Sequence, residues 1–172
     1  DFVVTPSPTF ANFVAGRNSE LLQHLMRLAA GDTRERFIYI WGLAGSGRTH
    51  LLKSALAAAQ SAGASAAYIA ASGATRFDAD TVFMDCVAVD DVDQLDAPAQ
   101  IELFNIYNGL RERNATLLVS GNAPPVQLKL REDVVTRLGW GLVYQVHALS
   151  DEEKTQALMI HAEGRGFRLS GE

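Results

Sequence analysis

The sequence predicts a three-layer α/β domain, in which a five-stranded, mainly parallel sheet has helices on both faces. Three observations predict this fold class. Short apolar runs recur along the chain, as expected of strands that are buried on both faces. Amphipathic segments with helical spacing separate these runs. The alternation of the two implies right-handed crossovers between parallel strands, and 172 residues suit one such domain.

The first elements follow an extended leader. Residues 1–9 carry Pro6 and Pro8 and predict no helix. Leucines at helical spacing predict a helix from Asn18 or Ser19 that ends before Gly31. The continuous apolar run 37–41 then predicts a strand with both faces buried.

A glycine-rich turn over residues 42–47 connects that strand to the next helix. An apolar stripe predicts a helix over 48–60, and a weaker strand follows at 66–70. Residues 72–80 show neither helical nor strand periodicity, so a loop is expected there. A buried strand follows at 86–89, bounded by acidic residues.

The second half of the chain continues the alternation. A broad apolar face over 98–113, with proline in the first turn, predicts a strong amphipathic helix. Apolar runs predict strands at 116–120 and 142–146. The sequence 150–153 is a capping box, which predicts a final helix that fades between residues 164 and 166.

The charge balance limits the classes of function. Fifteen basic and twenty acidic residues give a net charge of −5, which argues against a domain that holds DNA mainly by neutralising phosphates, so any DNA contact should be weak or indirect. No apolar run approaches the ~18–20 residues that span a membrane. The single cysteine, Cys86, excludes an intrachain disulfide and favours the cytoplasm.

The run Gly42-Leu43-Ala44-Gly45-Ser46-Gly47-Arg48-Thr49 fits the phosphate-binding motif G-x-x-x-x-G-K-[ST], except that arginine replaces lysine. Main-chain amides in such a turn surround phosphate oxygens, and the start of the following helix adds partial positive charge. Thr49 would supply a hydroxyl to Mg²⁺, and the cation at position 48 would reach the outer phosphates. The alternative is a tight turn without a ligand; the preceding strand, the following helix and Thr49 in register favour phosphate binding.

Arginine at position 48 predicts altered chemistry. A guanidinium is larger than an ammonium, planar and always charged, so the two are not equivalent at a crowded phosphate site. We expect Arg48 to bind a diphosphate. Relative to lysine at this position, arginine should preserve nucleotide binding better than it preserves fast hydrolysis.

The strand at 86–89 ends in two acids, as a Walker B element does. In that interpretation Asp90 holds Mg²⁺, through water, and Asp91 polarises the attacking water. An ordinary polar turn is the alternative, in which Asp91, Asp93 and Asp96 are solvated. The P-loop upstream favours the Walker B interpretation.

Asn122 and Arg137 are two further candidates for catalytic residues. If the strand at 116–120 lies between those at 37–41 and 86–89, the Asn122 amide faces the place of the γ-phosphate and its water. Local turn formation also explains an asparagine here, and the sequence does not separate the two. Arg137 is either a solvated charge or an arginine finger that completes a neighbour's site, an effect worth ~10³–10⁵ in rate.

Together these motifs resemble the AAA+ ATPases, and more narrowly the family of the bacterial replication initiator DnaA. Residues 10–18, with Phe13 and Val14, resemble the segment that packs against adenine in that family, and the run from Gly47 to His50 and on to Leu52 resembles its phosphate loop. Residues 120–125 resemble its sensor 1 region and 137–142 its arginine-finger box. The resemblance implies bound ADP or ATP with Mg²⁺ and extends from residue 10 to 167.

Within that family the chain is most similar to the Hda group of regulators, which shares arginine in the P-loop. This resemblance implies that the chain, with nucleotide and the DNA sliding clamp, promotes hydrolysis of ATP held by the DnaA initiator, with Arg137 as the finger. Its own ATPase activity would be weak or missing, and homo-oligomers are possible. The clamp-binding peptide is not visible in residues 1–9.

We expect residues 10–167 to form the nucleotide-binding base domain, and 168–172 to begin the connection to a helical lid that is absent from this chain. Two alternatives remain open for function. One is an autonomous P-loop ATPase or an ATP-binding fragment of a DnaA-type initiator. The other is a scaffold whose P-loop is empty and which works through protein contacts alone.

Overall fold

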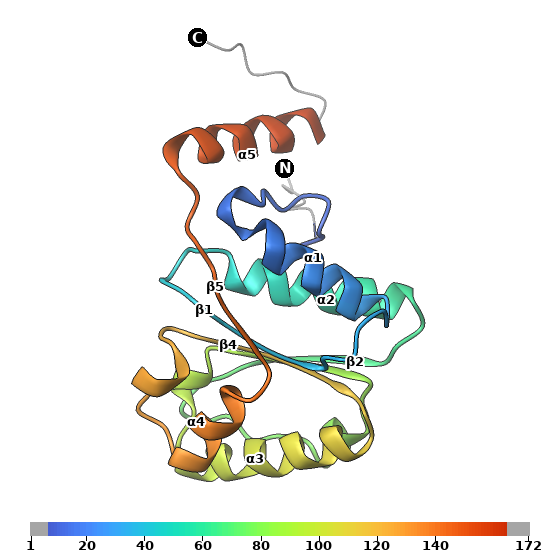
Figure 1. Ribbon diagram of the computed structural model, residues 1–172, viewed down its shortest axis with the longest axis vertical. Coiled ribbons are helices and arrows are strands. Elements are labelled where there is room, and N and C mark those ends of the chain that lie inside the picture. Colours follow the sequence, from blue (N-terminus) through green and yellow to red (C-terminus); the bar gives the residue numbers. More distant parts are fainter. Residues whose placement is uncertain (1–6, 165–172) are drawn as a thin grey trace.

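The computed structural model describes residues 7–164 and contains the predicted sheet in the order β2-β3-β4-β1-β5. All four neighbouring pairs are parallel. The helices α1 and α2 lie on one face, and α3 and α4 on the other, which gives three layers (Figure 1). The predicted fold class is therefore confirmed.

The boundaries of the predicted elements agree closely with the structure. The strands are β1 (Phe37–Trp41), β2 (Ala66–Ala70), β3 (Cys86–Asp90), β4 (Thr116–Gly121) and β5 (Leu142–Gln145). The helices are α1 (Ser19–Ala29), α2 (Arg48–Ser61), α3 (Ala97–Glu112), α4 (Glu132–Leu138) and α5 (Asp151–Gly164). Short 3-10 turns are η1 (Gly16–Asn18), η2 (Ala79–Phe83), η3 (Val92–Gln94) and η4 (Pro125–Gln127).

Two elements differ from the expectation. Helix α4 was not predicted, because seven residues are too few to show a clear helical period. The 3-10 turn η2 overlaps the end of the loop expected at 72–80. The capping box is present: the Glu153 N–H donates to Ser150 Oγ and the Ser150 N–H to Glu153 Oε1. The expected end of the domain at residue 167 and the segment 168–172 lie outside the described residues.

The sheet separates two apolar cores, because successive side chains of each strand point to opposite faces. On β1, Ile38 and Ile40 face α1 and α2, whereas Tyr39 faces α3. On β4, Leu118 belongs to the first core, and Leu117 and Val119 belong to the second. The alternation therefore fixes which polar side chains near the strand ends face α2.

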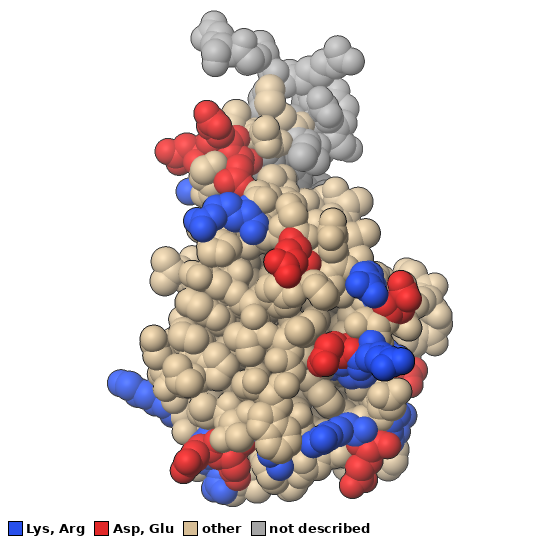
Figure 2. Space-filling model, viewed as in Figure 1, with Lys and Arg blue, Asp and Glu red and all other residues tan. Residues whose placement is uncertain are grey.

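The surface mixes charges of both signs. On the face shown in Figure 2, basic and acidic side chains are interspersed and form no continuous basic area. Within the described residues, no helix has the length and apolar character needed to cross a membrane.

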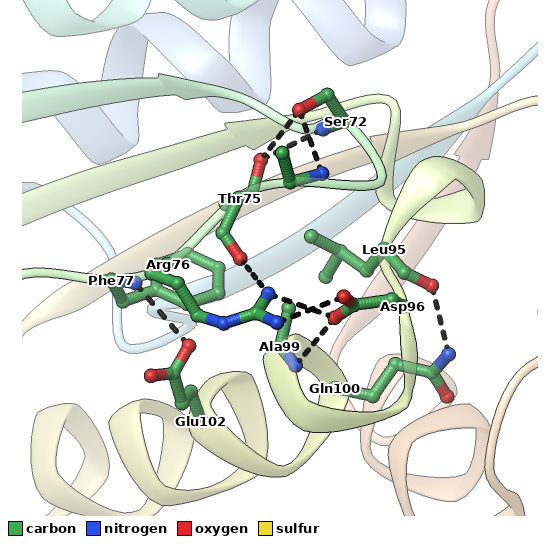
Figure 3. Close-up of polar contacts among 10 residues, drawn as sticks. Ser72, Thr75, Arg76, Phe77, Leu95, Asp96, Ala99, Gln100 and Glu102 are labelled. Carbon is green, nitrogen blue, oxygen red and sulfur yellow. Dashed lines mark hydrogen bonds and ion pairs between the residues drawn. The ribbon is translucent and has the colours of Figure 1, made fainter.

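A polar network attaches the segment after β2 to the start of α3 (Figure 3). Both guanidinium NH2 groups of Arg76 donate to the carboxylate of Asp96, at 3.0 Å each. The same carboxylate caps α3 by accepting from the Ala99 N–H at 3.0 Å. One turn later, Glu102 accepts from the Phe77 N–H at 3.3 Å. These bonds hold the segment against α3.

Candidate functional site

The candidate site lies at the carboxyl edge of the sheet, where β1, β3 and β4 end side by side. The P-loop connects the end of β1 to the start of α2. In open α/β sheets this edge is the usual place for a ligand. The strand order also fulfils the condition set for Asn122, since β4 lies between β1 and β3.

Two glycines illustrate why the P-loop backbone needs this residue type. Gly47, the residue before α2, has φ 104°, a left-handed conformation that other residues rarely adopt. At Gly42, a Cβ atom would lie 2.6 Å from the Val146 carbonyl oxygen, so the segment after β5 would have to move. Both glycines thus shape the loop.

The loop offers donors that fit a phosphate. Within the described residues, the first-turn N–H groups of Arg48, Thr49 and His50 have no acceptor. The Ser46 hydroxyl is also buried without a hydrogen-bond partner in that part of the chain. An anion at the start of α2 would satisfy the amides and gain from the helix dipole. The arrangement therefore fits the predicted polyphosphate.

The next group is a carboxylate that three hydroxyls surround. Thr49 Oγ1 donates to Asp90 Oδ2 at 2.5 Å, and the Tyr68 hydroxyl donates to the same oxygen at 2.6 Å. The Ser120 hydroxyl donates to Asp90 Oδ1. The predicted metal-binding pair, Thr49 and Asp90, is thus brought together.

The two adjacent acids have opposite pKa shifts. Burial alone would raise the pKa of Asp90, but hydrogen bonds from Ser120, Thr49 and Tyr68, with the charge of Arg48, hold it below the ordinary value. The pKa of Asp91 is raised by burial and by the charge of Asp90, against the opposing effect of Arg48. Asp90 therefore keeps its negative charge to lower pH than Asp91 does.

Arg48 extends from the start of α2 across the edge. Its NH1 donates to the Gly121 carbonyl at the end of β4, and its NH2 lies 3.3 Å from Asp91 Oδ1. The side chain is only 12% exposed. Arg48 and Asp90 converge on one site, as the sequence predicts, but Arg48 also pairs with Asp91, which the sequence did not predict.

A hollow of about 170 Å³ borders the other side of the P-loop. Its lining includes the predicted nucleotide-contacting residues Phe13, Val14 and His50. The Phe13 and His50 rings are tilted to one another, with centroids 5.3 Å apart. The segment before α1 thus meets the P-loop where the resemblance places adenine. Of the other predicted P-loop residues, Gly45, Ser46 and Gly47 line this hollow, and Gly42 and Ala44 do not.

Asn122 lies just after β4 and is exposed. Its backbone N–H donates to Asp93 Oδ1 at 3.2 Å. This bond ties the end of β4 to the turn after β3. Asn122 is therefore at the predicted edge, with its main chain fixed.

Arg137 lies on the α3 side of the sheet, near the end of α4. Its guanidinium carbon is 3.8 Å from the centroid of the Trp140 ring and 5.1 Å from that of Phe104. Within the described residues, Arg137 has no carboxylate within 4 Å, and its buried Nε has no hydrogen-bond acceptor. Over residues 7–164, its aromatic contacts are with Phe104, Tyr107 and Trp140, and none is with its own P-loop.

Sequence reasoning missed two donors to Asp90, namely Tyr68 and Ser120. Ser120 lies two residues after Leu118 and therefore on the same face of β4, so it could have been assigned to the α2 face once β4 was placed. Tyr68 comes from the weaker strand β2, and only the pairing of β2 with β3 brings it to Asp90.

Comparison with known proteins gives the family. The family model described as the bacterial DnaA ATPase domain matches residues 4–145. In structure, the chain is similar to AMPPCP-bound DnaA from Aquifex aeolicus, at 21% identity and a TM-score of 0.77, over 98% of this chain and 58% of that one. It is also similar to domain III of DnaA from Thermotoga maritima, at 21% identity and a TM-score of 0.77, over 96% and 78% of the two chains.

A third similar structure is protein NMB1076 from Neisseria meningitidis. It is 39% identical, with a TM-score of 0.56, over 64% of this chain and 74% of that one. This chain covers 58% of the length of the Aquifex aeolicus DnaA chain. With the P-loop and the five-stranded parallel sheet in place, the match over residues 4–145 shows that this chain belongs to the bacterial DnaA ATPase domain family.

Proposed function

We propose that this chain is a nucleotide-binding regulator of the Hda type, which promotes hydrolysis of ATP bound to the DnaA initiator by supplying Arg137 in trans. One observation carries the proposal: Arg137 is a partly exposed cation that, within the described residues, has neither a carboxylate partner nor a contact to its own P-loop. An arginine in that position is suited to an anion on another molecule.

Nucleotide binding is the first part of this function. The free amides at the start of α2, the unpaired Ser46 hydroxyl and the Arg48 guanidinium support binding of ADP or ATP. The AMPPCP-bound DnaA of Aquifex aeolicus supports a nucleotide in a fold of this kind. Thr49 and Asp90 would hold Mg²⁺, which supplies neutralisation of phosphate charge when bound.

The contacts of Arg48 support slow intrinsic hydrolysis. Asp91, assigned to polarise the attacking water, is paired with Arg48 at 3.3 Å. The attacking water would have to share that carboxylate with the guanidinium, which draws Asp91 Oδ1 towards Arg48. The site thus favours holding a nucleotide over turning it over.

We therefore expect the full-length protein to bind ADP and to hydrolyse ATP slowly by itself. The measurement is direct titration with ADP, followed by steady-state ATP hydrolysis at saturating ATP. A kcat of roughly 1 s⁻¹ or more, near the lower end for ordinary enzymes, would contradict the regulator and favour an autonomous ATPase. Lack of any affinity for ADP or ATP would favour the empty scaffold.

The proposed trans activity depends on the guanidinium of Arg137. Arg137→Ala should reduce stimulation of initiator-bound ATP hydrolysis by about 10³-fold or more, because a developing charge in the partner's site loses its cation. The measurement is single-turnover hydrolysis of ATP preloaded on DnaA, in the presence of the DNA-loaded sliding clamp. Nucleotide and clamp binding should be nearly unchanged.

Arg131→Ala is the matched control. Arg131 is also an arginine on the α4 side of the sheet, but it pairs with Asp133 at 3.2 Å and is exposed. The control variant should stimulate hydrolysis as the parent does. Stimulation that survives Arg137→Ala would rule out the trans-finger role.

The remaining proposed partners are the sliding clamp, a second copy of this chain and DNA. The clamp contact and a homo-oligomer follow from the resemblance to Hda regulators. The mixed charges in Figure 2 support a weak or indirect contact with DNA. Tight binding of DNA by the chain alone would instead favour the alternative function, an ATP-binding fragment of a DnaA-type initiator.

A further inference from the structure

The hydroxyl of Tyr68 has no place in the motifs that define the nucleotide site. It comes from β2, at the edge of the sheet, and donates to Asp90 Oδ2 at 2.6 Å. Asp90 is the acid assigned to Mg²⁺, so a protein hydroxyl on the same oxygen bears directly on how the site binds the cation.

The strand register brings the tyrosine there. Tyr68 pairs with Ala88, and Ala70 pairs with Asp90. Tyr68 and Asp90 thus lie on the same face of adjacent strands, one diagonal step apart, within reach of a long side chain. Thr49, in the first turn of α2, contacts this face at the same carboxylate.

The acceptor capacity of Asp90 is nearly used up. A carboxylate has about four lone-pair sites. Thr49 and Tyr68 use two of them on Oδ2, and Ser120 uses one on Oδ1. Mg²⁺ in nucleotide sites keeps several of its waters, which donate to carboxylates of this kind. The tyrosine takes one of the positions that such a water needs.

Two features keep the Tyr68 hydroxyl in place as a donor. Lys53, one turn after Thr49 on α2, places its Nζ 4.9 Å from the centroid of the Tyr68 ring. The register of β2 against β3, in which Tyr68 pairs with Ala88, holds the hydroxyl beside Asp90. The tyrosine is thus a stable competitor for the carboxylate.

We propose that Tyr68 sets the metal dependence of this site: its hydroxyl occupies an acceptor position on Asp90 that water around Mg²⁺ would otherwise use, and ADP binding depends only weakly on Mg²⁺. The inference rests on the proposed nucleotide binding.

The test is calorimetric titration of the full-length protein with ADP, in Mg²⁺ and in EDTA. For the parent, removing Mg²⁺ should weaken ADP binding by less than about threefold, because Arg48 and the amides carry the phosphate contacts. Tyr68→Phe should make the effect of Mg²⁺ about tenfold or more, since it frees one lone pair of a charged acceptor. Binding of Mn²⁺ in the presence of ADP, followed by electron paramagnetic resonance, should tighten in the same variant.

Tyr144→Phe is the matched control. It removes a phenolic hydroxyl from β5, where the Tyr144 ring contacts His24 rather than Asp90. This variant should keep the parent's weak response to Mg²⁺. Circular dichroism of both variants checks that they fold. The effect of Mg²⁺ on ADP binding by the parent is a test that depends on no substitution.

The outcomes separate the two proposals. ADP binding that already weakens more than tenfold in EDTA for the parent would overturn the role of Tyr68, as would an unchanged Mg²⁺ response in Tyr68→Phe, while nucleotide binding would stand. Lack of ADP binding by the parent under both conditions would overturn the nucleotide site itself and the inference with it.

Discussion

Two arginines in different regions of the molecule are held by different chemistry. At the carboxyl edge, Arg48 donates to the Gly121 carbonyl and pairs with Asp91, so its charge is neutralised within the chain. On the α3 side, Arg137 lies against the rings of Trp140 and Phe104. Its charge has no counter-ion among the described residues.

The difference teaches how the same residue type serves two purposes. A guanidinium that pairs with a carboxylate of its own chain is fixed in position. An incoming phosphate must share the guanidinium with that carboxylate. A guanidinium on aromatic rings is held by about 0.5–2 kcal/mol, so an external anion can draw it away at little cost. Arg48 is therefore suited to holding a ligand of its own chain, and Arg137 to reaching a partner.

Replacing Arg48 tests the first half of the comparison and should have the larger effect. Arg48→Ala should weaken ADP binding by about 10- to 100-fold, because a charge-assisted contact to phosphate is lost. Arg48→Lys keeps the charge and should lose much less. Both are measured by calorimetric titration with ADP.

Arg137→Ala is the matched control in this titration, since the comparison places Arg137 outside the nucleotide site. It should bind ADP as the parent does. If Arg48→Ala also bound ADP with parental affinity, Arg48 would serve only its internal ion pair, and the contrast between the two arginines would fail.

The sequence predicted the elements that local patterns define. The apolar runs that form the strands and the glycine turn after β1 depend on neighbouring residues only. Helix α4 is different, because its start is set by a distant contact: the Arg131 N–H donates to Gln100 Oε1 on α3 at 2.8 Å. Such a helix forms through tertiary packing, which a short sequence window does not contain.

In the candidate site, too, local motifs predicted some contacts, and other contacts depend on the tertiary structure. Thr49 and Asp90 were predicted from two local motifs, and the structure brings them within 2.5 Å. The contacts of Tyr68 and Ser120 with Asp90 depend on strand order and register, which the sequence left open. The contact of Arg137 with the Phe104 ring likewise joins α4 to α3, and it could not be predicted from the motif around Arg137.

The paired acids at the end of β3 allow a finer test within the Arg48 region. Ser120→Ala removes a donor to Asp90 and also the acceptor of the Asp91 N–H, which lies 2.9 Å from Ser120 Oγ. We expect the free energy of unfolding at about pH 6 to fall by about 1–3 kcal/mol. Urea unfolding followed by circular dichroism measures it.

The pH dependence of that loss identifies its electrostatic part. The pKa of Asp90 is lower in the folded chain than in the unfolded one, so its contribution is present above the unfolded value near 3.8 and is lost as the pH falls through the lower folded value. The difference between Ser120→Ala and the parent should therefore shrink towards pH 3 or below.

Ser54→Ala is the control, because Ser54 is equally buried but its hydroxyl donates to the neutral carbonyl of His50 at 2.7 Å. Its cost should be the same from about pH 5 to pH 3, since no acid titrates in that bond. If both variants lost stability in parallel over this range, the hydroxyl of Ser120 would not be what lowers the pKa of Asp90. The assignment of Asp90 as the stronger acid beside Arg48 would then have to be abandoned.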